Sequence, residues 1–212
     1  MIKITVGIPT RGVLFAETVQ SSLNNPELKS SSFHIIQNRT LPDAHNECIR
    51  QALKTDCTHI LFVEDDMVIP KGAINKMITM AEQGARYIAV DYGFVKNGQG
   101  VECIFEYEGE ILWTGLGCTM IDRDIFEKDL AREAPNWLTD EYELTYTDNP
   151  KTAIPQKKKR PYGGYDIFLG YQLRLKGIKL HRVEGFRCKH LRMASLDRKL
   201  SNEGLYEIEV IT

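Results

Sequence analysis

The stretch ILFVEDDM, residues 60–67, decides how this chain is interpreted. Its first four residues are apolar, as is typical of a strand buried on both faces of a parallel sheet. Three carboxylates follow at the end of that strand, on Glu64, Asp65 and Asp66. Like charges this close repel one another and are costly to desolvate, so a compensating group is expected. The pattern predicts an α/β protein with a chemically active site at the end of this strand.

Short apolar strands and amphipathic helices alternate over the first ninety residues. We expect strands at 2–8, 33–37, 59–63 and 87–90, and helices after residue 12, at 42–53 and at 71–83. In the first of these helices Phe15, Val19 and Leu23 recur at helical spacing. Such alternation favours a mostly parallel sheet with helices on both faces, in which ligands bind beyond the carboxyl ends of the strands. The polar turn at 9–12 follows the first strand and is therefore expected at that same edge.

The second half of the sequence has a different pattern. We expect a hairpin from strands 101–107 and 110–113, a strand at 117–121, a helix at 123–131, a long surface loop at 135–161, a helix at 165–176 and strands at 179–183 and 206–211. In the last helix Phe168, Tyr171 and Leu175 share one side. Hairpins beside βα units predict a mixed sheet. The fold class is therefore α/β, a mixed and mostly parallel central sheet flanked by helices in a single domain, 1–212.

Composition restricts the class of protein further. The chain has 212 residues with 27 Lys and Arg against 29 Asp and Glu, and a net charge of −2, so it has no overall basic field to attract nucleic acid or an anionic membrane. No apolar run approaches the roughly 18 residues of a membrane helix. The five cysteines include no C-x-x-C pair, which favours free, buried thiols. We expect a soluble cytoplasmic protein without a membrane span, for which nucleic acid is not a partner.

A divalent cation is the simplest compensating group for the carboxylates at 64–66. Mg²⁺ and Mn²⁺ prefer oxygen ligands, commonly one or two carboxylates together with substrate phosphates and water. The alternative is a solvated acidic turn in which Asp66 caps the next helix.

Three segments in order resemble the nucleotide-binding half of a GT-A fold glycosyltransferase of the family 2-like type: VGIPTRG at 6–12, AHN at 44–46 and FVEDDMVIP at 62–70. In that superfamily an Asp-x-Asp segment at a strand end holds Mn²⁺ or Mg²⁺ on the diphosphate of a nucleotide sugar. The resemblance implies this role for 64–66. Glu64 replaces the first Asp of the motif, which leaves Asp66 as the main metal ligand and Asp65 or Glu64 as its helper.

Two segments of the second half extend the resemblance. Residues 114–121 resemble the acceptor-side strand of the family, and Gly163-Gly164-Tyr165-Asp166 resembles its "Glu-Asp" helix start. Tyr165 stands in place of the Glu, so only Asp166 is carried over as the catalytic residue that reaches the acceptor hydroxyl. His190 lies where many such enzymes have a carboxyl-terminal His metal ligand. The resemblance implies a nucleotide-binding half, 1–92, and an acceptor-side half, 93–212.

The implied activity is transfer of a sugar from a nucleotide sugar, with a UDP-sugar as the expected donor, to a hydroxyl of a glycan or glycoprotein. Size and motifs resemble small glycosyltransferase domains of bacteria, large DNA viruses and phages, including the chlorella-virus type that glycosylates capsid protein, which would place a viral enzyme in the host cytoplasm. The donor contacts implied are Pro9, Thr10, Arg11, Gly12, Asn38, Arg39, His45, Asn46, Glu64 and Asp65. The acceptor contacts implied are Asp91, Trp113 and Gly115.

Plainer roles and other functions stay open. The alternative role for Gly12 is to relax a tight turn. The run Lys157 to Arg160 is by default a solvated loop, and its alternatives are clamping a diphosphate or pairing with acidic loop residues. A nucleotidyltransferase acting on a sugar phosphate is an alternative, but the turn at 9–12 has no Gly-rich phosphate loop with a lysine. A non-catalytic nucleotide- or carbohydrate-binding module is another, because Glu64 and Tyr165 depart from the family motifs. A dinucleotide oxidoreductase is disfavoured, because no G-x-G-x-x-G follows the first strand.

Overall fold

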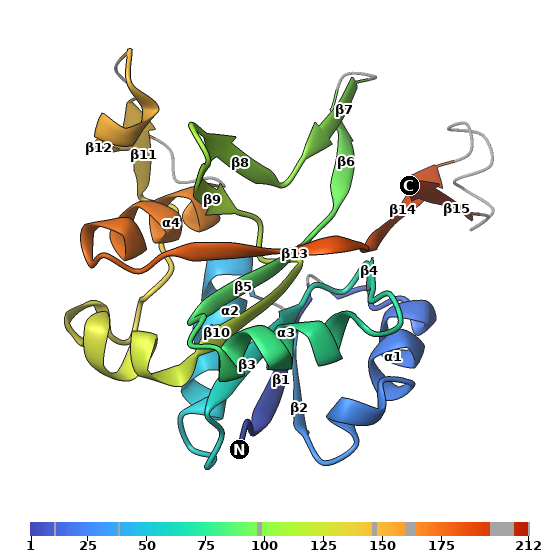
Figure 1. Ribbon diagram of the computed structural model, residues 1–212. Coiled ribbons are helices and arrows are strands. Elements are labelled where there is room, and N and C mark those ends of the chain that lie inside the picture. Colours follow the sequence, from blue (N-terminus) through green and yellow to red (C-terminus); the bar gives the residue numbers. More distant parts are fainter. Residues whose placement is uncertain are drawn as a thin grey trace.

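The computed structural model describes residues 1–10, 12–37, 39–96, 99–145, 148–159, 164–195 and 206–211. At its centre is a mixed sheet with the strand order β13-β5-β10-β3-β1-β2 (Figure 1). These strands are β1 (Ile4–Pro9), β2 (Ser32–Ile36), β3 (His59–Val63), β5 (Tyr87–Asp91), β10 (Cys118–Asp122) and β13 (Leu180–Arg187). Neighbours are parallel except β10, which is antiparallel to both β3 and β5. The predicted fold class, a mixed and mostly parallel sheet flanked by helices in one domain, is confirmed.

Helices cover both faces of this sheet. They are α1 (Ala16–Leu23), α2 (Leu41–Ala52), α3 (Ala73–Glu82) and α4 (Tyr165–Leu175). Strand β3 supplies both hydrophobic cores, because successive side chains point to opposite faces. Ile60 and Phe62 belong to the core beneath α2 and α4, whereas Leu61 and Val63 belong to the core beneath α3. The carboxylates that follow Val63 are therefore attached to the most deeply anchored strand.

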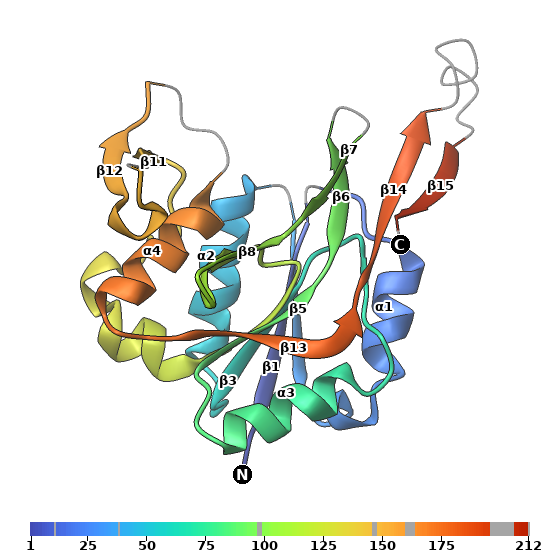
Figure 2. The same ribbon diagram turned by 45° about the horizontal axis from the view of Figure 1, so that its top comes forward.

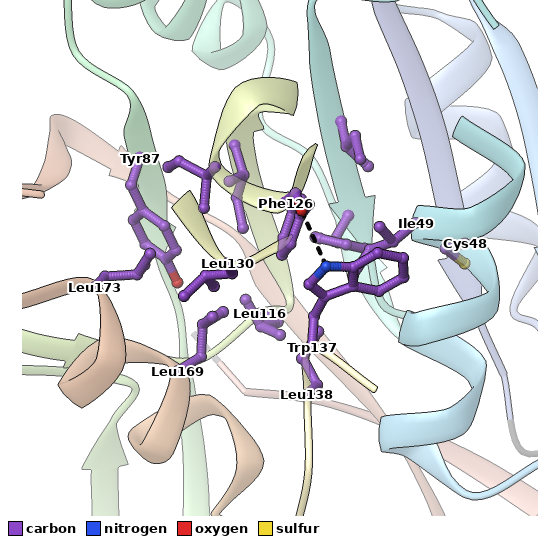
Figure 3. Packing of buried hydrophobic residues seen from close by; sticks show 14 of the residues in the cluster. Cys48, Ile49, Tyr87, Leu116, Phe126, Leu130, Trp137, Leu138, Leu169 and Leu173 are labelled. Atoms are coloured by element: carbon purple, nitrogen blue, oxygen red, sulfur yellow. Dashed lines mark hydrogen bonds between the residues drawn. The ribbon is translucent and has the colours of Figure 1, made fainter. Parts of the chain in front are cut away.

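The core beneath α2 and α4 includes a segment with irregular helical turns (Figure 3). The helix expected at 123–131 is present, but its hydrogen bonding is irregular: Ile125–Asp129 form a π-helix and Ala131–Glu133 a 3-10 turn. Leu130 N donates to Ile125 O, five residues earlier. The carbonyl of Phe126 instead accepts a 3.0 Å hydrogen bond from the buried indole of Trp137, so it is engaged outside the helix.

Short strands form hairpins beyond the sheet edge at which β1 and β3 end (Figures 1 and 2). Strand β14 pairs with β4 as well as with β15, which ties this part of the chain to the segment after β3. The strands are β4 (Met67–Val68), β6 (Gly93–Lys96), β7 (Gln99–Glu102), β8 (Ile104–Tyr107), β9 (Glu110–Thr114), β11 (Tyr142–Thr145), β12 (Ile154–Lys157), β14 (Lys189–Ser195) and β15 (Tyr206–Ile211). Short 3-10 turns lie at η1 (Pro26–Leu28) and η4 (Pro150–Thr152).

Two predicted segments differ from the structure here. The expected strand 101–107 is divided at Cys103, where the chain passes from one hairpin to the other: its N–H bonds to Tyr92 O in line with the β6–β7 pairing, and its carbonyl accepts from Gly115 N in line with β8–β9. The expected long loop at 135–161 contains the antiparallel pair β11–β12 and the turn η4. All four residues of β12 are exposed. The strand therefore has no buried face, and its sequence lacks the apolar–polar alternation that would predict it.

Two helices also present different faces from the ones their apolar spacing indicates. In α1 the buried residues are Thr18 and Ser22, while Leu23 is 59% exposed, because the helix packs on the polar segment after β3. In α4 Leu175 is 69% exposed, and Phe168 stacks on Tyr142 of β11 at a centroid distance of 4.9 Å. The sheet-facing residues of α4 are Tyr165, Leu169, Gly170 and Leu173.

All five cysteines are free and buried, as predicted. None of the helices in the described ranges is long and apolar enough to span a lipid bilayer.

Candidate active site

The acidic segment 64–66 is held in place by its main chain. Each of its residues bonds to a different part of the chain, so the segment cannot turn as a free loop. The hydrogen bonds run from Glu64 N to Gly117 O (2.9 Å), from Phe15 N to Asp65 O (3.1 Å) and from Leu191 N to Asp66 O (2.7 Å). Thr18 of α1 adds a hydroxyl bond of 2.9 Å to Asp65 O.

Asp66 and His190 form what we call the outer pair. The pairing of β14 with β4 sets His190 opposite Met67, and its Nε2 lies 2.9 Å from Oδ2 of Asp66. Its Nδ1 donates to the carbonyl of Gly93 at 3.0 Å. Burial lowers the pKa of His190, but the hydrogen bond and charge of Asp66 outweigh it and raise this pKa above its usual value. Both ring nitrogens therefore face acceptors.

Glu64 and His45 form what we call the inner pair. His45 is fully buried, and its Nδ1 donates to the carbonyl of Leu41 at 2.8 Å, since a carbonyl can only accept. Its Nε2 has no hydrogen-bond partner among the described residues and lies 3.9 Å from Oε1 of Glu64. Burial lowers the pKa of His45 to about 4. The hydroxyl of Tyr165 donates to the same oxygen of Glu64 at 3.3 Å.

The neighbouring carboxylates of the site raise the proton affinity of Glu64. Burial, followed by the charges of Asp66 and Asp166, raises the pKa of Glu64 to about 8. Burial also raises the pKa of Asp166, which lies in the first turn of α4 and accepts from Ile167 N at 2.9 Å. The site therefore carries an excess of negative charge that a bound cation would neutralise.

The outer pair fits a divalent cation. Oδ1 of Asp66 is buried and has no hydrogen-bond partner in the described part of the chain. The Gly93 carbonyl keeps a proton on Nδ1 of His190, so a cation that displaces the Nε2 proton would meet the Nε2 lone pair and the Asp66 carboxylate on the same side. Among the residues that the structure describes, no group of three or more His, Cys, Asp or Glu side chains is gathered to hold a metal. Two protein ligands suit Mg²⁺ or Mn²⁺ when substrate phosphates and water complete the coordination.

The predicted turn after β1 is shaped by Thr10. Its buried hydroxyl donates to Val13 O at 2.8 Å and accepts from Gly12 N at 3.0 Å. Gly12 has φ +119°, a conformation that other residues rarely adopt. Pro9 ends β1 opposite Ile36. These three residues build the turn, while the predicted contacts Arg11 and Asn38 lie outside the described residues.

Two other predicted donor contacts are engaged elsewhere. The Arg39 side chain is 47% exposed and lies 3.7 Å from Glu47 in an ion pair. Asn46 is buried and bonds to the main chain of Leu138 in both directions, at 2.8 and 2.9 Å. Its amide fastens α2 to the segment that carries Trp137, so its polar atoms are not directed toward a ligand.

The predicted acceptor residues lie in three settings. Asp91 ends β5, where its carbonyl accepts from Cys188 N at 2.8 Å. Gly115 is buried against Tyr92, whose hydroxyl occupies the space that a Cβ would need. Trp113 is partly exposed and stacks on Phe105 with ring centroids 5.8 Å apart.

Sequence reasoning missed two residues of the site. In the sequence Tyr165 stands out only as a departure from a motif, although its hydroxyl donates to Glu64. Lys158 is the half-buried member of a run in which Lys157 and Lys159 are exposed. Its charge lowers the pKa of Asp166 against the larger effect of burial. No sequence signal separates it from its neighbours, because hairpin geometry decides which lysine turns inward.

Comparison with known proteins establishes the fold. No family model matches the chain, and no curated protein matches its sequence. Among solved structures, A197 from STIV is 14% identical with a TM-score of 0.59, over 90% of this chain and 85% of that one. CMP:2-keto-3-deoxy-manno-octonic acid synthetase complexed with CTP is 9% identical with a TM-score of 0.47, over 95% and 96% of the two chains. At these identities the likeness shows the architecture, and the second is too distant to support any argument.

Proposed function

We propose that this protein is a metal-dependent glycosyltransferase that moves a sugar from a nucleotide sugar, with a UDP-sugar as the expected donor, to a hydroxyl of a glycan or glycoprotein. The observation that carries the proposal is the outer pair, Asp66 and His190, at the carboxyl end of β3 beside Asp166. This is the edge at which α/β sheets bind ligands. The buried, unpartnered Oδ1 of Asp66 supports a ligand there.

Asp66 and His190 would hold Mn²⁺ or Mg²⁺, with Asp65 as the helper that the resemblance implies. A cation bound there supplies charge neutralisation for the diphosphate that leaves the sugar. Gly93 and the pairing of β14 with β4 keep the imidazole oriented, so that little reorganisation is needed when the donor binds.

The other residues of the site have separate roles in this proposal. Tyr165 and His45 contact Glu64 from the protein interior and hold its carboxyl group in position. Asp166 accepts the proton of the acceptor hydroxyl if the enzyme inverts the anomeric centre. In a retaining enzyme the leaving phosphate takes that proton, and Asp166 positions the acceptor. Lys158 beside it favours the ionised form. Pro9, Thr10, Arg11, Gly12 and Asn38 remain proposed donor contacts.

The first test is calorimetric titration of the purified protein with UDP-, GDP- and CMP-sugars, with Mn²⁺ and then with EDTA. We expect one nucleotide class to bind only with the metal. Asp66→Asn should lose this binding, whereas Asp56→Asn, on a carboxylate that is 84% exposed and paired with Lys3, should keep it. Binding that persists in EDTA would overturn the metal assignment. Release of pyrophosphate from a nucleoside triphosphate would favour a nucleotidyltransferase instead.

A second test concerns Asp166. Asp166→Asn should lower turnover much more than donor affinity, because the side chain acts on the acceptor. A collapse of donor affinity with unchanged turnover at saturation would place Asp166 in the donor site.

A further inference from the structure

An apolar pocket of about 210 Å³ is lined by Phe105, Trp113, Pro150 and Ile167, the residue that follows Asp166 in the chain. Phe105 and Trp113 come from the β8–β9 hairpin, Pro150 begins the turn η4 and Ile167 follows Asp166 in α4. The packing of α4 on β9 brings these elements together. Three separate elements thus form one small pocket, and one of them, α4, also carries the proposed catalytic carboxylate of Asp166.

The pocket is built from partly exposed apolar side chains. Phe105 and Trp113 are direct partners across the hairpin, with their rings 5.8 Å apart and only 19° from parallel. All four lining residues are half-buried, and none of them has a polar side-chain group except the indole N–H of Trp113. A stacked aromatic pair that keeps exposed surface offers a face for another ring or alkyl chain.

The size and lining of the pocket indicate its ligand. Pockets for complete small molecules are roughly 300–1,000 Å³, so this one takes a single group of a larger molecule. A sugar ring alone would leave its hydroxyls without partners against four apolar side chains. An apolar group attached to a sugar would bury its surface here while the sugar hydroxyl remains near Asp166.

We propose that this pocket is a subsite for the acceptor, and that it selects acceptors carrying an apolar aglycone, aromatic or alkyl. The inference rests on the proposed function, since it needs Asp166 to face the acceptor hydroxyl. The residues that determine acceptor specificity are then Phe105, Trp113, Pro150 and Ile167.

Tryptophan fluorescence tests the pocket without an activity assay. The chain has two tryptophans; Trp137 is only 4% exposed in the core, so Trp113 is the one that a ligand can reach. Phenyl glucoside should change the emission saturably, and methyl glucoside should not at the same concentration. Trp113→Phe should remove the signal while keeping a ring in place.

Two alanine variants distinguish the pocket from general aromatic contacts. Phe105→Ala should weaken phenyl glucoside binding about five- to tenfold, as expected for loss of one aromatic face. Tyr142→Ala is the matched control, because Tyr142 belongs to the other stacked pair, with Phe168, and does not line the pocket. It should bind like the unmodified protein. Phe105→Leu, which keeps apolar volume, provides a second variant if the alanine variant melts early.

The outcomes separate the two proposals. Equal responses to phenyl and methyl glucosides, or equal losses in the Phe105 and Tyr142 variants, would overturn the subsite. The same samples are titrated with UDP-sugars and Mn²⁺. Donor binding without phenyl glucoside binding overturns the subsite alone, whereas phenyl glucoside binding without any donor binding overturns the proposed function and with it the acceptor role of this pocket.

Discussion

The inner and outer pairs combine the same residue types in opposite environments. Each places a carboxylate from the segment after β3 opposite a histidine, yet the histidine pKa is lowered to about 4 in His45 and raised in His190. His45 is sealed between Phe62 and Tyr165, with ring centroids 5.2 and 5.3 Å away. His190 has a carbonyl on one ring nitrogen and a carboxylate on the other.

This difference shows that a carboxylate and a histidine do not by themselves define a metal site. In the inner pair, burial without a charged hydrogen-bond partner favours the neutral imidazole of His45 and the protonated carboxyl of Glu64. A histidine held between a backbone carbonyl and a hydrogen-bonded carboxylate, as in the outer pair, is the arrangement that suits the proposed metal ligands. Glu64 and Asp66 are only two residues apart in the chain, yet the histidines that they face have pKa values shifted in opposite directions.

The largest expected effect concerns metal-dependent donor binding. Asp66→Asn should weaken Mn²⁺-dependent nucleotide-sugar binding by more than about 100-fold, and Glu64→Gln by only about tenfold, the range typical of outer contacts of a metal site. Calorimetry with matched Mn²⁺ and EDTA titrations measures both. Equal losses in the two variants would break the distinction between the pairs.

The next effect is on stability against acid. Unfolded His45 takes up a proton below pH 6.5, but the folded protein does so only below about pH 4. The unfolded state therefore binds more protons in this window, and stability falls as the pH drops through it, by up to about 3 kcal/mol. Denaturant unfolding in EDTA at pH 7, 5.5 and 4 measures this loss.

The informative quantity is the difference between the unmodified protein and His45→Phe. Glu64 has a raised pKa, so its contribution is lost as the pH rises and it opposes the slope from His45. The variant should gain stability relative to the unmodified protein as the pH falls. Parallel curves for the two proteins would mean that His45 is not the buried neutral group described here.

A smaller effect tests the support of the outer pair. Tyr92 packs edge-on against His190 at 5.7 Å, and Gly115 leaves room for its hydroxyl. Gly115→Ala should therefore cost up to about 3 kcal/mol of stability and weaken Mn²⁺ binding. Adding Tyr92→Phe should restore part of the stability, since the hydroxyl is the nearest atom. No recovery in the double variant would contradict this packing explanation.

The smallest effect tests the support of the inner pair. Asn46 follows His45 in α2 and bonds twice to Leu138, so Asn46→Ala should lower the free energy of unfolding by about 1–2 kcal/mol without changing donor affinity. Asn75→Ala, on the exposed side of α3, is the matched control and should change stability by less than about 0.5 kcal/mol. A tenfold loss of donor affinity in Asn46→Ala would restore its predicted role as a donor contact.

Several elements could be predicted because their signal is local. The buried run at 59–63, the helix at 42–53 and the first parallel strands follow from apolar periodicity, and each occurs close to its expected bounds. Asp66 and His190 are 124 residues apart, so no local pattern could bring them together. Their association was implied only by the resemblance of the chain to GT-A glycosyltransferases.

Other features had no signal in the chain. Thr18 and Ser22 of α1 are buried because the helix meets a polar main-chain segment, and apolar spacing cannot show that. The exposure of β12 and the half-buried position of Lys158 both depend on how the β11–β12 pair packs beside α4.

The sequence by itself determined the strand-helix order, the mixed sheet and the position of three carboxylates at a strand end, since apolar periodicity is a property of neighbouring residues. Only the tertiary structure decided which carboxylate meets which histidine. The ionisation of those pairs depends on burial and on acceptors from distant strands, such as the Gly93 carbonyl, and these distances exist only after the chain has folded.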